Sequence, residues 1–164
     1  MRRHAGTRPA KAQNRGSLPC RRKKGEYVLE HVPPKFRTAD LCLAAVSRRN
    51  DELQYVPRKL RTAKLCFAAV EQDGGALAYV PEDMITLGLC LAAVRQNGNA
   101  LEYVSTRLKT AELCTAAVRQ GGSLGFVPVG LRTTELCVAA VGQWVGAFSY
   151  VPKKINAMVK EHFK

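Results

Sequence analysis

The sequence lacks the long apolar runs that would place the chain across a membrane. No stretch approaches the ~18 consecutive apolar residues of a transmembrane helix, and the amino terminus has no apolar segment of the signal-peptide type. Aromatic residues are scarce, at 7% of 164 residues, whereas 46% are apolar and 24% are charged. This composition excludes a wholly disordered chain and predicts a mainly globular, cytoplasmic protein.

The sequence also lacks the motifs of common enzymes and metal sites. It has no phosphate loop joined to Lys-Ser/Thr, no His-Glu-x-x-His, no Gly-x-Ser-x-Gly and no Cys-x-x-Cys. The three histidines, His4, His31 and His162, share no motif with the scattered acidic residues. Because catalysis needs groups that converge, we expect a protein that is not an enzyme and that uses no metal or other cofactor.

What the sequence does contain is an internal repeat. Successive intervals of 24, 24, 24 and 23 residues separate five cysteines, Cys42, Cys66, Cys90, Cys114 and Cys137. A Tyr-Val-Pro-like tripeptide keeps the same step, and the one missing residue falls within 120–125. Such a period indicates a stack of equivalent units, because a unit this small cannot bury its apolar face alone.

Each unit predicts one longer helix followed by a shorter helical element. A threonine four residues before each cysteine can cap the helix start, and Leu-Cys-x-Ala-Ala-Val supplies an apolar stripe. Gly74, Gly98 and Gly122 predict left-handed C-caps. The remainder, for example 76–81, predicts two helical turns, with a strand, as in leucine-rich repeats, as the alternative. The predicted fold class is all-α: an α-solenoid of about five and a half 24-residue helical-hairpin repeats.

Charge and consensus divide the chain into two parts. Residues 1–25 hold nine of the 26 basic residues and no acidic one, which predicts a disordered basic tail. Residues 26–164 form the predicted repeat domain. Its segment 153–164 leaves the consensus and mixes apolar with charged residues, as a terminal cap would. The ragged first unit leaves open that the array is a fragment of a longer repeat protein.

The units resemble a known family. The similarity rests on 110–120 (Thr-Ala-Glu-Leu-Cys-Thr-Ala-Ala-Val-Arg-Gln), on Gln-Asn-Gly at 96–98 and on Leu-Glu-Tyr-Val-Ser at 101–105. These segments are similar to the repeats of the bacterial family called domain of unknown function 4116. The resemblance covers about residues 26–164 and implies a tandem helical scaffold with no established activity and no catalytic residues. Ile85, in place of Arg or Lys, departs from the pattern.

The cysteines are predicted to be core residues. Equivalent positions on stacked helices lie ~8–10 Å apart, whereas a disulfide needs Cα atoms within about 7 Å and a shared Zn²⁺ needs still closer sulfurs. We therefore expect five small, buried side chains. Cys20, outside the register, is predicted to be a free thiol, which fits a reducing compartment.

Two basic features are candidate binding surfaces. The residue directly before the capping threonine is basic in four units and is Ile85 in the third. We call the four basic residues the Arg/Lys ladder: Arg37, Arg61, Lys109 and Arg132. It could hold an acidic peptide or a nucleic-acid backbone, or be a solvated edge. The tail could bind phosphates through Arg2, Arg3, Arg21, Arg22, Lys23 and Lys24. A solubilising tail, a targeting remnant and an eroded repeat are the alternatives.

Aromatic residues add one further candidate. Trp144, the only tryptophan, is interpreted either as an exposed binding anchor or as a residue packed against the terminal cap. The ring that recurs in each unit is predicted to pack in the core, at Tyr55, Tyr79, Tyr103, Phe126 and Tyr150. We expect a non-enzymatic scaffold that binds a protein or peptide through the Arg/Lys ladder and Trp144. The alternative is nucleic-acid binding through tail and ladder. No oligomeric state is predicted.

Overall fold

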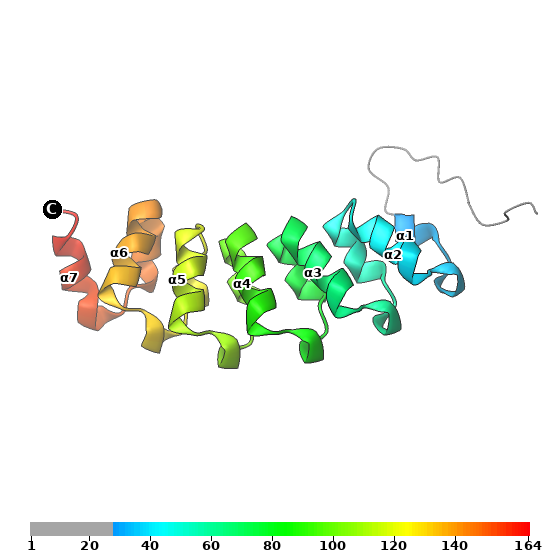
Figure 1. Ribbon diagram of the computed structural model, residues 1–164. Coiled ribbons are helices and arrows are strands. Elements are labelled where there is room, and N and C mark those ends of the chain that lie inside the picture. Colours follow the sequence, from blue (N-terminus) through cyan, green and yellow to red (C-terminus); the bar gives the residue numbers. More distant parts are fainter. Residues whose placement is uncertain (1–27) are drawn as a thin grey trace, which may run out of the picture.

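The computed structural model describes residues 28–164, and every regular element among them is a helix (Figure 1). The predicted all-α class is confirmed. The alternative of a strand in the second half of each unit is wrong, because those segments form 3-10 helices. None of the helices in this part of the chain is long and apolar enough to cross a membrane. The predictions for the tail and for Cys20 lie outside the described residues.

Three kinds of element recur in a fixed order. The long α-helices are α2 (Ala39–Val46), α3 (Ala63–Gln72), α4 (Leu87–Gln96), α5 (Ala111–Arg119) and α6 (Thr134–Gln143). The short 3-10 helices are η2 (Asn50–Tyr55), η4 (Gly74–Tyr79), η6 (Gly98–Tyr103), η8 (Leu124–Phe126) and η10 (Val145–Tyr150). Three-residue helical turns connect the units: η1 (Pro34–Phe36), η3 (Arg58–Leu60), η5 (Glu82–Met84), η7 (Thr106–Leu108), η9 (Val129–Leu131) and η11 (Lys153–Ile155).

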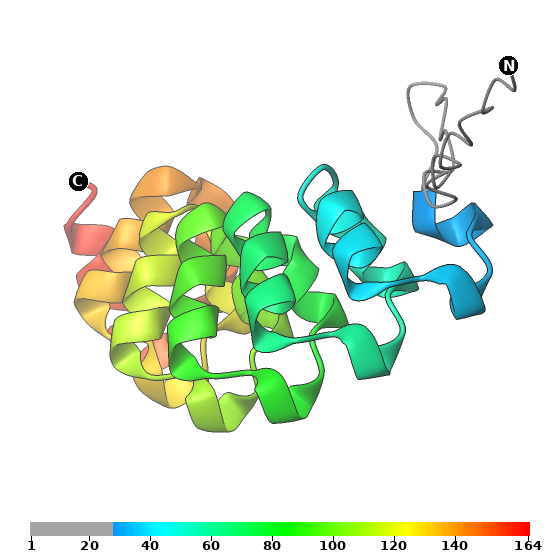
Figure 2. The same ribbon diagram turned by 45° about the vertical axis from the view of Figure 1, so that its right-hand side comes forward.

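These elements stack into a row. In Figure 1 the long helices α3 to α6 lie side by side, and the three-residue turns follow one edge of the row. The short helices η4 and η6 contact each other and also the long helix of the following unit, so that two layers of helices run along the array (Figure 2). At the two ends lie the short helices α1 (Val28–His31) and α7 (Asn156–Glu161), of which α7 packs on α6.

The predicted threonine caps are confirmed at the start of every long helix. In each case the Thr Oγ1 accepts a hydrogen bond, at 3.2–3.3 Å, from the backbone N–H of the leucine three residues later. This bond satisfies one of the free amides at the helix start. The capping residues are Thr38, Thr62, Thr86, Thr110 and Thr133.

The predicted left-handed glycine caps are wrong. Helix α3 ends at Gln72, the extended residue Asp73 (φ −150°) follows, and Gly74 then starts the next 3-10 helix. Among the described residues only Gly121 has a positive φ, of 77°. There the N–H groups of Gly121 and Gly122 donate back to Val118 and Ala117, in the unit that is one residue shorter than the others.

The glycines are instead required by close packing between units. A Cβ on Gly74 would lie 2.1 Å from the carbonyl oxygen of Ala93 in α4, and one on Gly98 would lie 2.2 Å from that of Ala117 in α5. Real Cβ atoms do not approach backbone this closely. At these two positions the short helix of one unit therefore rests directly on the backbone of the next unit's long helix, which only glycine permits.

The core is a continuous apolar cluster along the array, and the five in-register cysteines are part of it. Cys42, Cys66, Cys90, Cys114 and Cys137 are fully buried free thiols, which confirms the interpretation as small core side chains. Burial raises the pKa of each of these thiols above its usual value, because it disfavours the charged thiolate.

Burial predicts that the five core thiols are protected in the folded protein. In a Cys20→Ser variant, we expect almost no reaction with a thiol reagent under native conditions at mildly alkaline pH, because the reactive thiolate is both inaccessible and disfavoured. All five thiols should react rapidly after denaturation. Fast labelling of any of them in the native protein, measured by mass spectrometry, would contradict the packing described above.

The contact between short and long helices predicts opposite effects for two glycine substitutions. Gly98→Ala should lower the free energy of unfolding by about 1–3 kcal/mol, because backbone must shift to admit the Cβ. The matched control is Gly88→Ala within α4, where nothing lies within 4 Å of the added Cβ. That change should raise stability by about 0.5–1 kcal/mol, because alanine is the better helix former. Urea denaturation measures both; equal effects would refute the close contact.

Candidate binding surface

The Arg/Lys ladder connects successive short helices from within the array. The guanidinium of Arg61 donates through Nε to the carbonyl of Val56 at 2.9 Å and through Nη2 to that of Gln54 at 3.2 Å. Its Nη1 donates to the carbonyl of Tyr79, in the next unit, at 2.7 Å. One side chain therefore satisfies the free carbonyls at the ends of two short helices.

The other ladder residues repeat this arrangement. Arg132 donates to Val127 at 2.9 Å, to Tyr150 at 2.8 Å and to Gly125 at 3.3 Å. Arg37 likewise bridges carbonyls in two units, at Val32 (2.8 Å) and Tyr55 (2.5 Å). Lys109 makes a single such bond, from Nζ to the carbonyl of Phe126 at 2.9 Å.

The ladder therefore has a structural role that neither of the two interpretations included. All four residues are half-buried, and their donors point to backbone carbonyls of the array. In the third unit Ile85 takes the same position, and its side chain packs against the core. The donors of the predicted cationic edge are thus largely occupied by internal hydrogen bonds.

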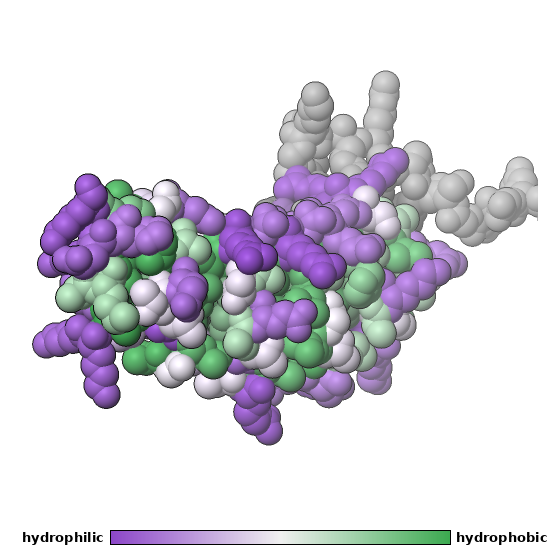
Figure 3. Space-filling model, turned by 60° about the vertical axis from the view of Figure 1, so that its left-hand side comes forward, coloured by the Kyte–Doolittle hydropathy of each residue, from purple (hydrophilic) through white to green (hydrophobic). Residues whose placement is uncertain are grey.

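The recurring aromatic ring is only partly in the core. Tyr55 and Phe126 are half-buried against it, as expected, but Tyr79, Tyr103 and Tyr150 are exposed. Apolar and polar side chains are interspersed on the face shown in Figure 3, where green patches are separated by purple side chains. The prediction that the recurring ring packs in the core therefore holds in two of the five units.

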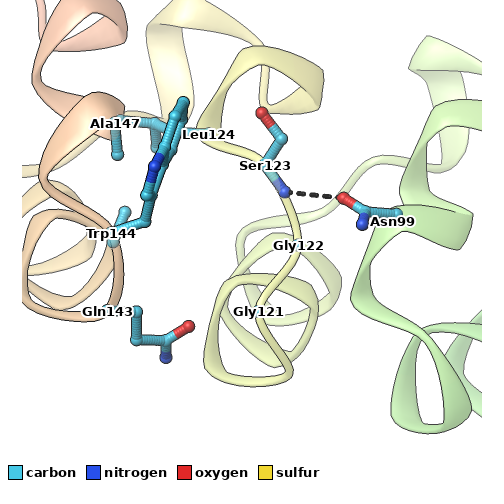
Figure 4. Close-up of a pocket in the computed structure, with 9 residues that line it drawn as sticks. Asn99, Gly121, Gly122, Ser123, Leu124, Gln143, Trp144 and Ala147 are labelled. Carbon is cyan, nitrogen blue, oxygen red and sulfur yellow. Dashed lines mark hydrogen bonds between the residues drawn. The ribbon is translucent and has the colours of Figure 1, made fainter.

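Trp144 borders a hollow of about 490 Å³ between the last two complete units (Figure 4). It is 59% exposed, and its indole lies against the backbone of Gly146. Leu124 and Ala147 supply apolar lining, while Asn99, Ser123 and Gln143 add polar groups. Of the two interpretations of Trp144, the structure favours the exposed residue, because no residue of 153–164 lines this hollow.

Polar groups around the hollow are held in place by bonds between units. The N–H of Ser123 donates to Oδ1 of Asn99 at 3.0 Å, across one unit boundary (Figure 4). The side-chain amide of Gln143 donates to the carbonyl of Arg119 at 3.3 Å, across the next. Among the described residues, the Asn99 amide N–H groups and the Gln143 carbonyl oxygen make no further hydrogen bond.

Trp144 lacks a local interaction that two of its four counterparts make, since Arg49 does not cap its short helix with its side chain and Gly121 has no side chain. At the equivalent position in earlier units, Asp73 accepts from the N–H of Gly75 at 2.8 Å and Asn97 accepts from that of Asn99 at 3.0 Å. Each bond caps a short helix. An indole has no acceptor, and no side chain caps η10.

Glu52, which no sequence motif singled out, is the one charged residue among the buried residues of the described chain. Its carboxylate accepts hydrogen bonds from the backbone N–H groups of Val28 and Leu29, the latter at 2.9 Å. It thereby fixes α1 to the first complete unit. The signal was available in the sequence, since Glu52 stands where other units have Ala76 or Ala100.

Within residues 28–164, no group of three or more His, Cys, Asp or Glu side chains is placed to hold a metal ion. His31 and His162 are both exposed and lie near opposite ends of the array.

The recurring elements, shared caps and shared register define a helical repeat protein. Residues 64–109 and 86–132 each match the model of the family described as Domain of unknown function (DUF4116). The chain therefore carries repeats of the DUF4116 family within 64–132, as its resemblance to that family predicted. Searches of curated proteins and of solved structures gave no significant match.

The ladder geometry predicts that Arg61 contributes to stability. Arg61→Ala should lower the free energy of unfolding by about 2 kcal/mol, because three carbonyls lose a charged donor. Arg61→Lys should cost less, since Lys109 shows that a lysine keeps one such bond. Arg58→Ala is the control: this residue makes only an exposed ion pair with Asp83, at 3.3 Å, and its loss should cost less than about 1 kcal/mol. Equal losses for Arg61→Ala and Arg58→Ala in urea denaturation would reject the structural role.

Proposed function

We propose that the protein is an α-solenoid of about five and a half hairpin repeats that acts as a non-enzymatic scaffold and binds a protein or peptide segment at the Trp144 hollow. The observation that carries the proposal is Trp144 itself, a large aromatic side chain that is 59% exposed beside a hollow of about 490 Å³. Exposed tryptophans that can be buried by a partner are the commonest energetic anchors of protein interfaces.

The hollow offers what a peptide segment needs. Leu124, Ala147 and the indole provide apolar surface for a side chain. The Asn99 amide N–H groups and the Gln143 carbonyl oxygen are free to pair with a peptide C=O and N–H, respectively. The contact of the indole with Gly146 keeps the ring oriented before binding, which reduces the entropy lost on association.

Local energetics support the same conclusion. A helix cap contributes about 1 kcal/mol, and Trp144 lacks the cap that Asp73 and Asn97 provide at the equivalent position. An exposed indole gains little by itself in water. A position that gives up stability in this way is where a functional requirement is expected.

Nucleic-acid binding is supported less well by the described residues. The donors of the Arg/Lys ladder are directed to carbonyls inside the array. The turns along the edge are also mixed in charge, because η5 carries Glu82 and Asp83 where η3 carries Arg58 and Lys59. That function would depend on Arg2, Arg3, Arg21, Arg22, Lys23 and Lys24, which lie outside the described residues.

The proposal predicts that one substitution separates stability from binding. Trp144→Asn should raise the free energy of unfolding by about 1 kcal/mol, because Asn can cap η10 as Asn97 caps η6. The same change should abolish binding of peptides selected on the wild-type protein from a random library. Such peptides should shift the emission of the single tryptophan to shorter wavelength as they bury it.

Phe67→Ser is the matched control, since Phe67 is another exposed aromatic residue, on α3. It should leave peptide binding unchanged. Peptides that bind Trp144→Asn as well as they bind the wild type would place the interaction elsewhere. Failure to select any peptide, together with salt-sensitive binding of RNA or DNA, would favour the nucleic-acid alternative.

A further inference from the structure

Two equivalent hollows, one unit apart, differ in their charge. The first, of about 400 Å³, includes in its lining Arg58, Arg61, Ala78 and Tyr79. The second, of about 580 Å³, has the residues 24 positions later: Glu82, Ile85, Glu102 and Tyr103. Glu82 and Ile85 therefore stand where the first hollow has Arg58 and Arg61, and Glu102 stands where it has an alanine.

In the first hollow an arginine of the chain itself binds a backbone carbonyl. There the Arg61 guanidinium donates to the carbonyl of Tyr79 at 2.7 Å. The same bond recurs between Arg132 and the carbonyl of Tyr150 at 2.8 Å. In the second hollow Ile85 has no donor, and none of the described residues donates to the carbonyl of Tyr103.

We propose that the second hollow binds the guanidinium of an arginine presented by a partner protein. The incoming group would donate to the Tyr103 carbonyl, as Arg61 does to the equivalent carbonyl one unit before. Lys109 and Arg132 donate to the equivalent carbonyls one and two units after it. Glu82 and Glu102, both exposed on the lining, supply two carboxylates to the second hollow, whereas the first hollow has Glu82 alone beside Arg58 and Arg61. A planar guanidinium can bond a carbonyl and a carboxylate at once, whereas a lysine ammonium has no such fork.

Arg107 is the remaining charged residue of this lining. It is exposed, and among the described residues no ion pair joins it to Glu82 or Glu102. The two carboxylates therefore remain available. This site is separate from the Trp144 hollow, and the proposal does not depend on that hollow binding anything.

The test is a titration of the ¹⁵N-labelled full chain with N-acetyl-arginine amide at physiological salt, followed by NMR. Saturable shifts are expected at the backbone amides of Tyr103, Val104 and Ser105. The equivalent amides of Tyr79 and Val80 should not move, because Arg61 already fills their hollow. N-acetyl-lysine amide should bind several-fold more weakly. Equal shifts at Tyr79 and Tyr103, or shifts that do not saturate, would overturn the proposal.

Substitutions sharpen the test. Ile85→Arg should restore the internal bond to Tyr103 and weaken binding of the probe by about tenfold or more. Ile85→Leu, which adds no donor, should bind as the wild type does. Should Ile85→Arg perturb the fold, Glu82→Gln combined with Glu102→Gln gives the second measurement, and it should also weaken binding. Undiminished affinity in both variants would refute the site.

A further variant distinguishes the source of the arginine. Residues Arg21, Arg22, Lys23 and Lys24 are replaced by serine in the full chain. The partner source predicts that this variant and the wild type bind the probe equally. A probe that binds only the variant would assign the hollow to the chain's own basic segment, and the partner source would then be wrong.

Discussion

The backbone contact between the short helix of one unit and the long helix of the next sets the spacing of the array. At Gly74 and Gly98 a single Cβ would overlap the facing carbonyl, so the layers approach as closely as a polypeptide allows. The last unit has Val145 at the equivalent position, and this side chain is 78% exposed. Here the long helix α6 packs against α7, whose Val159 is fully buried, and not against another long helix on that side.

Hydrogen bonds between units satisfy backbone carbonyls that apolar packing would leave unpaired. Short 3-10 helices end in carbonyls that have no partner within the helix, and burying them unpaired would cost about 1–3 kcal/mol each. Arg61 and Arg132 satisfy such carbonyls in two units at once. Each of these arginines forms hydrogen bonds only within its own unit and with an adjacent unit. The stability of the array is therefore expected to be a sum over adjacent units, as in other repeat proteins.

Features set by the repeat period could be predicted from the sequence, whereas the contacts that side chains make between stacked units could not. Threonine caps, the apolar stripe and the buried cysteines follow from period and local preference, and the structure has them in every complete unit. Gly74 could serve as a helix cap or as a close contact, and nothing in its immediate sequence separates the two. Likewise the position of Arg61 could be derived, but not that its guanidinium turns inward to Tyr79, because that carbonyl is positioned only once the units have stacked.

Residues that differ from the repeat consensus are informative, because the equivalent residues of neighbouring units show which interaction is lost. Glu52 replaces a buried alanine, and its buried carboxylate is balanced by two backbone N–H groups of α1, so its gain lies within the fold. Ile85 and Trp144 are different. Ile85 provides no donor and leaves the Tyr103 carbonyl without one, and Trp144 lacks the helix cap made by Asp73 and Asn97 and exposes an indole. Neither loss is compensated by another residue of the described chain. Compensation from outside the chain would explain both, which is why these two positions, rather than the regular ladder, mark the candidate contact sites.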